Sequence, residues 1–273
     1  MPEKPEVLTV VKALRKRILG RKILNAKVYW DNIIAYPSVS EFCEKVKNQM
    51  IEDIDTRGKW IVIHLTDYVL LIHLRMEGKF FFRKVGEERT KHEHVVFLLD
   101  NQEEMRFHDV RKFGKMYLRD KSNYLNEVPL KEMGYEYNDE DLTNTYLYDK
   151  LRCKKISIKL SLLDQSIITG IGNIYDDEIL FLSKIDPKRR SNSITEDECQ
   201  KIIDNTRSVL DKAITLGGTT IKSFTSSEGV HGLFQNELLV HGKKNSFCPV
   251  CNSKIEVVKL GGRSTYYCPK CQK

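Results

Sequence analysis

The chain has 273 residues, of which 41% are hydrophobic and 30% charged, and this length favours two domains over one small core. The composition excludes a collagen-like or disordered protein, and no signal peptide or apolar run of about 18 residues occurs, so we expect neither secretion nor a membrane partner. The net charge of +7 favours a polyanionic partner without identifying it.

The chain begins MPEKPEV, in which a Pro-Glu pair occurs twice. Pro is tolerated in the first turn of a helix, so the stretch can simply begin an amphipathic helix over residues 7–19. Alternatively, removal of Met1 would expose the secondary amine of Pro2 beside the carboxylate of Glu3. These seven residues leave both interpretations open.

The next region, residues 22–119, is expected to form strands. Gly, Asp and charged clusters separate short runs that are rich in β-branched and aromatic residues. These runs lie at residues 60–65, 69–74, 80–83 and 94–99. Their spacing predicts an antiparallel sandwich or barrel. The strand-like pattern of residues ends after this region, and residues 127–141 are expected to be a linker.

Several polar and apolar residues of the β region are candidates that carry little weight alone. Arg111 and Phe113 stand two apart, so they would share one side of an extended segment and suit a wedge in an unstacked duplex. A strand end with a packed Phe is the simpler interpretation, and Met76 is expected in the core on the same reasoning. Lys59 and His73 are isolated polar residues at strand positions and indicate nothing by themselves.

Residues 142–215 follow a helical pattern. Ser193 resembles an N-cap with Glu196 three residues later, and the glycine pair at 217–218 is expected to end that helix. A loop through residues 225–229 follows.

The stretch GIGN at residues 170–173 interrupts two helical runs. Small residues permit a close approach of backbone to a ligand, and exposed amides between helices bind phosphate. The spacing does not fit a dinucleotide-binding fingerprint. From these residues alone, a glycine pair that packs helices together is the simpler explanation.

The seven cysteines are distributed unevenly, which favours a reducing compartment and a metal site over disulfides. Four of them have the C-x2-C…C-x2-C spacing of a structural zinc site: Cys248, Cys251, Cys268 and Cys271. The residues between the pairs suggest two β arms around a turn at 261–262. Arg263 follows that turn, where a guanidinium can bind a phosphate bidentately, although a solvated turn Arg explains it equally well.

Taken together, the motifs make the chain resemble the bacterial formamidopyrimidine-DNA glycosylases, which excise oxidised purines. The resemblance runs nearly end to end, and the related endonuclease VIII branch shares only part of it. The matching stretches are MPEKPEV, RGKW, HLRMEGKF, KHEHV, FHDVRKFG, LLDQSIITGIGNIYDDE, GGTTIKSF, FQNELLVHG and CPVC…GGRSTYYCPKCQ.

This resemblance implies an α+β fold in three parts. They are a β-sandwich with flanking helices (2–130), a helix–two-turn–helix domain (137–236) and a four-cysteine zinc hairpin (237–273), with damaged double-stranded DNA bound between the two main domains. It further implies one structural Zn²⁺, no redox or nucleotide cofactor, a monomer, and a cytoplasmic, nucleoid-associated enzyme.

The resemblance also implies the role of each candidate residue. Pro2, N-terminal after Met1 is removed, would be the nucleophile, with Glu3 as its acid/base partner. Lys59, His73, Asn173 and Arg263 match residues that hold phosphates, and Lys59 and Arg263 complete the catalytic set. Met76, Arg111 and Phe113 match the side chains that fill the gap after base extrusion, and His94 matches a DNA-binding residue. Residues 219–231 correspond to the loop that closes over the extruded base.

Two other functions stay open on the sequence. One is an endonuclease VIII-like enzyme that prefers oxidised pyrimidines, and the other is a zinc-ribbon protein that binds DNA without catalysis. The departures from the family pattern are few. Lys4 stands where Leu is common and Leu8 where many relatives have Glu, while Asp176 and Asp177 make the phosphate-binding turn more acidic.

Overall fold

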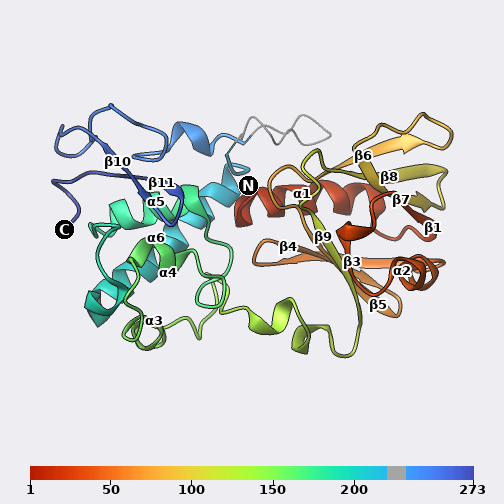
Figure 1. Cartoon of the computed structure of the whole chain (residues 1–273), viewed down its shortest axis with the longest axis horizontal. Coiled ribbons are helices and arrows are strands. Elements are labelled where there is room, and N and C mark those ends of the chain that lie inside the picture. Colours follow the sequence, from red (N-terminus) through yellow and green to blue (C-terminus); the bar gives the residue numbers. More distant parts are fainter. Residues whose placement is uncertain (220–231) are drawn as a thin grey trace. The chain divides into compact units, whose positions relative to one another are not determined.

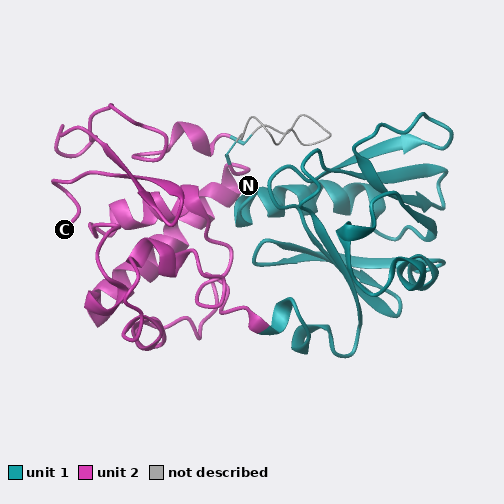
Figure 2. Cartoon of the chain, viewed as in Figure 1, with its two compact units in different colours: residues 1–131, 219–232 teal, residues 132–218, 233–273 magenta. Residues whose placement is uncertain are grey.

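The computed structural model of the chain describes residues 1–219 and 232–273, so the expected base-covering loop lies outside the described residues except for Thr219. The chain divides into two compact units, which Figure 2 distinguishes by colour. Unit 1 consists of residues 1–131 and 219–232, and unit 2 of residues 132–218 and 233–273. The division into three folding domains stays a prediction.

Unit 1 contains two sheets (Figure 1). An antiparallel sheet has the order β1-β7-β8-β6, with β1 (Ile23–Val28), β6 (Lys79–Lys84), β7 (Glu93–Leu99) and β8 (Glu103–His108). A second sheet has the order β2-β9-β5-β4-β3, with β2 (Ile34–Tyr36), β3 (Ile51–Arg57), β4 (Trp60–Leu65), β5 (Tyr68–His73) and β9 (Lys115–Asp120). Within it β2 runs parallel to β9, and the other pairs are antiparallel.

One hydrophobic core joins the two sheets, because fully buried residues of both belong to a single cluster. Val95 and Phe97 of β7 contribute from the first sheet, and Ile61 and Ile63 of β4 from the second. Strands that bury one face each in a common core form a sandwich. The antiparallel sandwich expected from the sequence is thus confirmed, as are strands at the four predicted runs.

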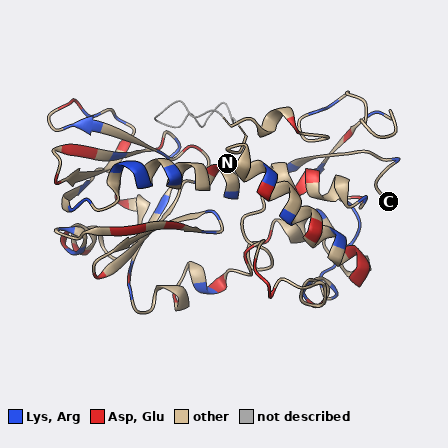
Figure 3. Cartoon of the chain, turned by 180° about the vertical axis from the view of Figure 1, so that it is seen from behind, with Lys and Arg blue, Asp and Glu red and all other residues tan. Residues whose placement is uncertain are grey.

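Two helices accompany the sheets. Helix α1 (Lys4–Ile18) begins earlier than predicted, because Glu3 serves as its N-cap and Pro5 occupies its first turn. It buries an apolar stripe that includes Val7, Val11 and Leu14, while its last turn is basic (Figure 3).

Helix α2 (Val39–Val46) lies in a region that was expected to form only strands, so that expectation is wrong there. The hydroxyl of Ser38 caps the helix by accepting a hydrogen bond from the Glu41 N–H. The helix buries Phe42 and Val46, which are four residues apart and lie on one face.

Unit 2 is helical and ends in a hairpin (Figure 1). Its helices are α3 (Asn144–Leu151), α4 (Ile158–Leu162), α5 (Asn173–Leu182) and α6 (Glu196–Thr215), and its strands are β10 (Glu256–Leu260) and β11 (Arg263–Tyr267). Among the residues that the structure describes, no helix is both long and apolar enough to cross a membrane.

The predicted N-cap of α6 is wrong. Thr195, not Ser193, caps the helix, and it forms a capping box with Glu198. Ile194, which precedes the cap, is buried in the core of unit 2, and this contact fixes where the helix begins. The predicted end is confirmed, since Gly217 and Gly218 follow the helix with positive φ angles of 74° and 78°.

Candidate functional site

The N-terminus is held by a hydrogen-bonded arrangement around Glu6. One oxygen of the Glu6 carboxylate accepts a hydrogen bond from the backbone N–H of Glu3 at 2.8 Å. The other oxygen accepts from the N–H and the hydroxyl of Thr219, at 2.8 and 3.1 Å. Glu3 and Glu6 are almost fully buried. Glu6 of the second Pro-Glu pair therefore helps to orient the first pair. From the sequence alone, this second pair was expected at most to begin the helix.

Four charged groups act on the N-terminal amine, which in this chain belongs to Met1. Its pKa is lowered below the ordinary value of 8.0, chiefly by burial. The carboxylates of Glu3 and Glu6 raise that pKa, whereas the cations of Lys59 and Arg111 lower it. A lowered pKa leaves more of the amine neutral near pH 7, which is the nucleophilic form.

Lys59 and His73 lie near each other on neighbouring strands of the second sheet. Lys59 directly precedes β4, and its neighbour Trp60 is paired in register with His73 at the end of β5. Lys59 is buried, with 5% of its surface exposed. The structure thus brings together two residues that were uninformative one by one.

His73 is a neutral hydrogen-bond donor. Its Nδ1 accepts a hydrogen bond of 2.9 Å from the Arg75 N–H, so the proton of the neutral ring is on Nε2. Burial, followed by the charges of Arg75 and Lys59, lowers its pKa to about 3. The ring therefore stays neutral, with its proton on Nε2, over the whole physiological pH range.

Two loops carry the expected gap-filling residues. Met76 and Phe113 expose 37% and 50% of their surface, so neither packs in the core as the simpler reading expected. The guanidinium carbon of Arg111 lies 4.8 Å from the ring centroid of Phe113. These three side chains line one cavity of about 610 Å³ within unit 1, together with Met1, Trp30, Asn32, Arg75, Lys112 and Lys115.

Both loops pack against the ring of Phe107. A Cβ on Gly78 would lie 2.8 Å from Cζ of Phe107, and a Cβ on Gly114 would lie 2.6 Å from the same atom. The buried carboxylate of Asp109 accepts from the N–H groups of Arg111 and Gly114, at 3.0 and 2.7 Å. Only glycine fits at these two positions without displacement of Phe107.

His94 lies beneath this second loop. It is buried, and its Nε2–H donates to the carbonyl oxygen of Asp109 at 2.9 Å. That bond supports the loop that carries Arg111. His94 can therefore affect ligand binding by holding Arg111 in position. A direct contact of His94 with DNA stays a prediction.

Asn173 and Arg263 are brought together within unit 2. Asn173 is the first residue of α5, where backbone N–H groups point out of the helix, and its side-chain amide donates to the Ser264 carbonyl at 2.9 Å. Arg263 is exposed and begins β11, next to Ser264. The helix N-terminus and the guanidinium thus form a cationic, donor-rich corner.

The turn at the hairpin tip positions Arg263. Gly261 and Gly262 have φ angles of 52° and 76°, as a two-residue hairpin turn requires. A Cβ on Gly261 would lie 2.5 Å from a methyl carbon of Leu160, whereas nothing lies within 4 Å of the Cβ position of Gly262. The tip therefore rests against Leu160 of α4.

A buried charge network, which the sequence reading missed, supports this corner. The ammonium of Lys159 lies 2.7 Å from a carboxylate oxygen of Asp177 and 3.4 Å from one of Asp176, and it donates to the Asn173 carbonyl. The second oxygen of Asp177 lies 2.6 Å from Nδ1 of His241. Both Asp side chains are buried, so their charge faces Lys159 and not a ligand on the surface.

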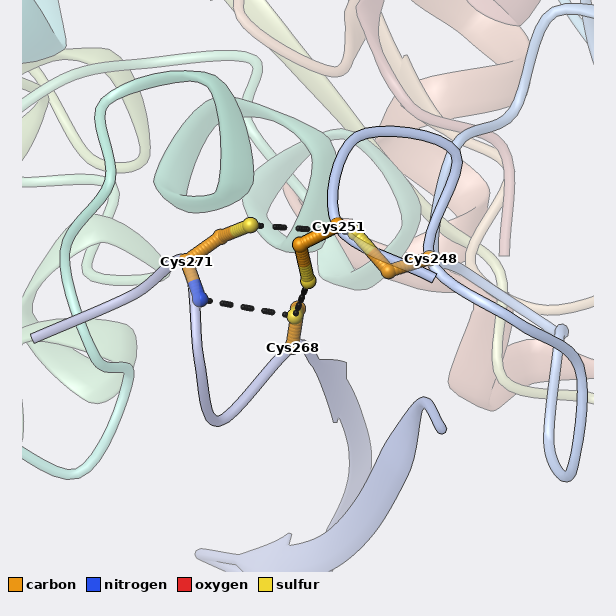
Figure 4. A group of neighbouring side chains, drawn as sticks. All are labelled: Cys248, Cys251, Cys268 and Cys271. Carbon is orange, nitrogen blue, oxygen red and sulfur yellow. Dashed lines mark hydrogen bonds between the residues drawn. The ribbon is translucent and has the colours of Figure 1, made fainter. Parts of the chain in front are cut away.

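The four predicted cysteines converge at the base of the hairpin (Figure 4). Their sulfur atoms all lie within 4.8 Å of one another. The pairs Cys248–Cys271 and Cys251–Cys268 are separated by 3.8 and 3.4 Å, close to the roughly 3.8 Å edge of a tetrahedron with Zn–S bonds of about 2.3 Å. With all four ligands from the protein, the site fits one structural Zn²⁺.

Comparison with family models gives matches in three segments of the chain. Residues 1–116 match the formamidopyrimidine-DNA glycosylase N-terminal domain, and residues 133–225 match the formamidopyrimidine-DNA glycosylase H2TH domain. Residues 245–273 match the zinc finger found in FPG and IleRS.

Full-length relatives and solved structures agree with these matches. The formamidopyrimidine-DNA glycosylases of Bacillus cereus and Bacillus subtilis are 42% and 38% identical to this chain, covering all of it and 99% of each relative. The Lactococcus lactis Fpg in complex with an abasic site containing DNA is 35% identical, with a TM-score of 0.91 and coverage of 99% of both chains. A structure of MutM in complex with carbocyclic 8-oxo-G containing DNA has a TM-score of 0.91, with 35% identity and full coverage.

Proposed function

Because this chain belongs to the formamidopyrimidine-DNA glycosylase family, we propose that it removes oxidised purines from double-stranded DNA and then cleaves the strand. The observation that carries the proposal is the buried carboxylate of Glu3 directly after Pro2, at a chain start where the charges of Glu3 and Lys59 act on the terminal amine, here that of Met1. A zinc-ribbon protein that only binds DNA has no need of such an amine. We further propose that it acts as a monomer on the nucleoid in the bacterial cytoplasm.

The chemistry proceeds through Pro2 once Met1 is removed. Its neutral secondary amine attacks C1′ of the damaged nucleotide, the bond from C1′ to the base breaks, and the base leaves with the electron pair and takes up a proton. Opening of the sugar ring gives an iminium, and Glu3 transfers protons to the sugar ring and the later intermediates. The iminium acidifies the adjacent C2′–H, so β-elimination expels the 3′ phosphate, and δ-elimination then expels the 5′ phosphate.

Each unit by itself offers a set of phosphate-binding groups. Lys59 supplies a buried cation and His73 a neutral donor, and Asn173 and Arg263 supply the donor-rich corner of unit 2. Cations on the flanking phosphates stabilise a nucleotide that has left the stack. When bound, the zinc ion stabilises the hairpin that carries Arg263 and takes no part in the chemistry.

Reduction with borohydride tests the nucleophile. We expect borohydride to link the protein covalently to a duplex with 8-oxoguanine opposite cytosine, and peptide mapping to place the adduct on Pro2. A variant with a bulky residue inserted between Met1 and Pro2, which keeps the amine blocked, should bind the duplex but give no adduct. A Glu3→Gln variant should also lose excision activity.

Two outcomes would overturn this assignment. One is an active wild-type protein that gives no adduct, and the other is an adduct on Lys59 that persists in a Pro2→Gly variant. The substrate class is tested separately, by comparing excision of 8-oxoguanine with excision of thymine glycol. Faster removal of thymine glycol would assign the enzyme to oxidised pyrimidines.

A further inference from the structure

The cavity of unit 1 contains an aromatic residue that the proposed function does not use. Trp30 lines it together with Met76 and Phe113, and 36% of the Trp30 surface is exposed. The only other tryptophan, Trp60, is 8% exposed and packs against His73 with ring centroids 4.8 Å apart. Trp30 thus presents its indole to the cavity, whereas Trp60 belongs to the packed interior.

The loop that carries Trp30 is anchored on both sides. Trp30 precedes the short 3-10 helix η1 (Asp31–Ile33), whose residue Ile33 is fully buried. The N–H of Tyr29 donates to the His94 carbonyl at 2.8 Å, and the ammonium of Lys115 donates to the Asn32 carbonyl. The backbone that carries the indole is therefore held in place before any ligand arrives, which reduces the entropy cost of binding.

One face of the indole is covered by a cation on a strained loop. The ammonium of Lys112 lies 3.9 Å from the centroid of the Trp30 ring. Lys112 has a φ of 58°, and Arg75, which lines the same cavity, has a φ of 53°. Non-glycine residues adopt this conformation at a cost of about 1 kcal/mol or more, and such residues cluster at functional sites.

The lining of the cavity defines the kind of ligand it takes. Three apolar side chains, Trp30, Met76 and Phe113, suit a flat aromatic group. The four cations that line the cavity, Arg75, Arg111, Lys112 and Lys115, suit an attached phosphate. A nucleobase with its backbone phosphate has both properties, since base–aromatic stacking and phosphate pairing occur together in nucleic-acid sites.

We propose that Trp30 stacks on the base opposite the extruded nucleotide, on the face that Lys112 covers in the free protein, and that Lys112 then pairs with a phosphate. This inference rests on the proposed function, in which Met76, Arg111 and Phe113 fill the gap left by extrusion. Trp30 lines the same cavity as these three side chains, and we therefore place the base that loses its partner beside the indole. The damaged base itself has left the stack and is not the occupant.

Intrinsic fluorescence tests the contact directly. Wild type and Trp30→Phe are titrated with a duplex that carries a tetrahydrofuran abasic analogue opposite cytosine. Because Trp60 contacts His73 and remains in both proteins, the difference between the two titrations isolates Trp30. We expect that difference signal to be quenched on binding, and a signal that does not change would contradict stacking.

Affinity decides which base is contacted. Trp30→Ala should weaken binding of this duplex by about 5- to 100-fold, and Trp30→Phe, which keeps an aromatic ring, should weaken it by less than about 3-fold. On a duplex with no base opposite the analogue, the effect of Trp30→Ala should disappear. Equal losses on both duplexes would overturn the proposed occupant. Trp30→Leu serves as a second variant if the alanine variant does not fold.

Salt dependence tests the role of Lys112. A Lys112→Met variant should reduce the slope of log Kd against log salt by about one, because one phosphate contact is lost. An unchanged slope would contradict the transfer of Lys112 to a phosphate. If the wild-type protein fails to bind any damaged duplex, the proposed function fails, and that result is distinct from a loss confined to the Trp30 and Lys112 variants.

Discussion

The carboxylate of Glu6 accepts hydrogen bonds from both the backbone N–H and the hydroxyl of Thr219, a residue 213 positions later in the chain. The same carboxylate accepts from the N–H of Glu3. One buried side chain thus connects the proposed acid/base residue to the last described residue before segment 220–231. All three residues are at most 5% exposed, so water cannot replace these bonds.

A Glu6→Gln variant tests this connection. Glutamine has only one acceptor oxygen. Its NH2 group would therefore point at the N–H of either Glu3 or Thr219, so that two hydrogen-bond donors face each other. We expect a loss of about 1–3 kcal/mol in the free energy of unfolding and a roughly 10- to 100-fold drop in kcat for base excision. Single-turnover kinetics and urea denaturation measure the two effects. Glu41→Gln, which changes an exposed carboxylate, is the control and should leave kcat unchanged; an equal kcat for both variants would refute the role of Glu6.

The buried His73 predicts a specific dependence of stability on pH. Its pKa of about 3 in the folded state is below the 6.5 of an unperturbed histidine. Between pH 6.5 and 3 the unfolded chain binds a proton at His73 that the folded chain does not, so the contribution of His73 to stability falls as pH decreases through this range and is nearly constant above it.

A His73→Gln variant removes this titration. As the pH is lowered from 8 to 5, we expect the wild type to lose about 2 kcal/mol more unfolding free energy than the variant, since pH 5 lies about 1.5 units below the unfolded pKa and each unit corresponds to about 1.4 kcal/mol. Denaturant unfolding at several pH values measures the difference. Parallel stability curves for the two proteins would show that His73 titrates normally. DNA affinity of the wild type should show no step attributable to His73 between pH 6 and 8.

The buried ion pairs of Lys159 predict a large loss of stability. A Lys159→Met variant leaves the carboxylates of Asp176 and Asp177 buried without their cation, and we expect a cost of about 3–5 kcal/mol in unfolding free energy. Lys154→Met is the matched control, because Lys154 pairs with Asp164 at a partly exposed site and should cost less than about 1 kcal/mol. Similar costs for the two variants, measured by denaturant unfolding, would be incompatible with a buried network.

The hairpin tip offers a matched pair of glycine variants. Both Gly261→Ala and Gly262→Ala place a side chain at positive φ, which costs about 1 kcal/mol. Gly261→Ala in addition places its methyl carbon 2.5 Å from a methyl carbon of Leu160, so either the Leu160 side chain or the tip that carries Arg263 must move. We expect Gly261→Ala to weaken binding to an abasic-site duplex several-fold more than Gly262→Ala, as measured by fluorescence anisotropy. Equal affinities would mean that Leu160 does not set the position of the tip.

Features that depend on neighbouring residues could be predicted from the sequence alone. The strand runs at 60–65 and 94–99, the end of α6 at the glycine pair and the four zinc ligands were all read from local pattern and spacing. These signals are local because backbone propensity, side-chain periodicity and a C-x2-C turn each act over a few residues. The candidate site residues came from the joint resemblance of many motifs and not from any single pattern.

Features that depend on residues far apart were decided only by the tertiary structure. The pairing of Lys159 with Asp177 and the bonds of Glu6 to Thr219 join segments whose separation no periodicity encodes. Two S/T-x-x-E matches precede α6, and burial of Ile194 selects the second of them. Packing fixes such choices because each lowers the free energy of the whole core, whereas local propensity leaves the alternatives nearly equal.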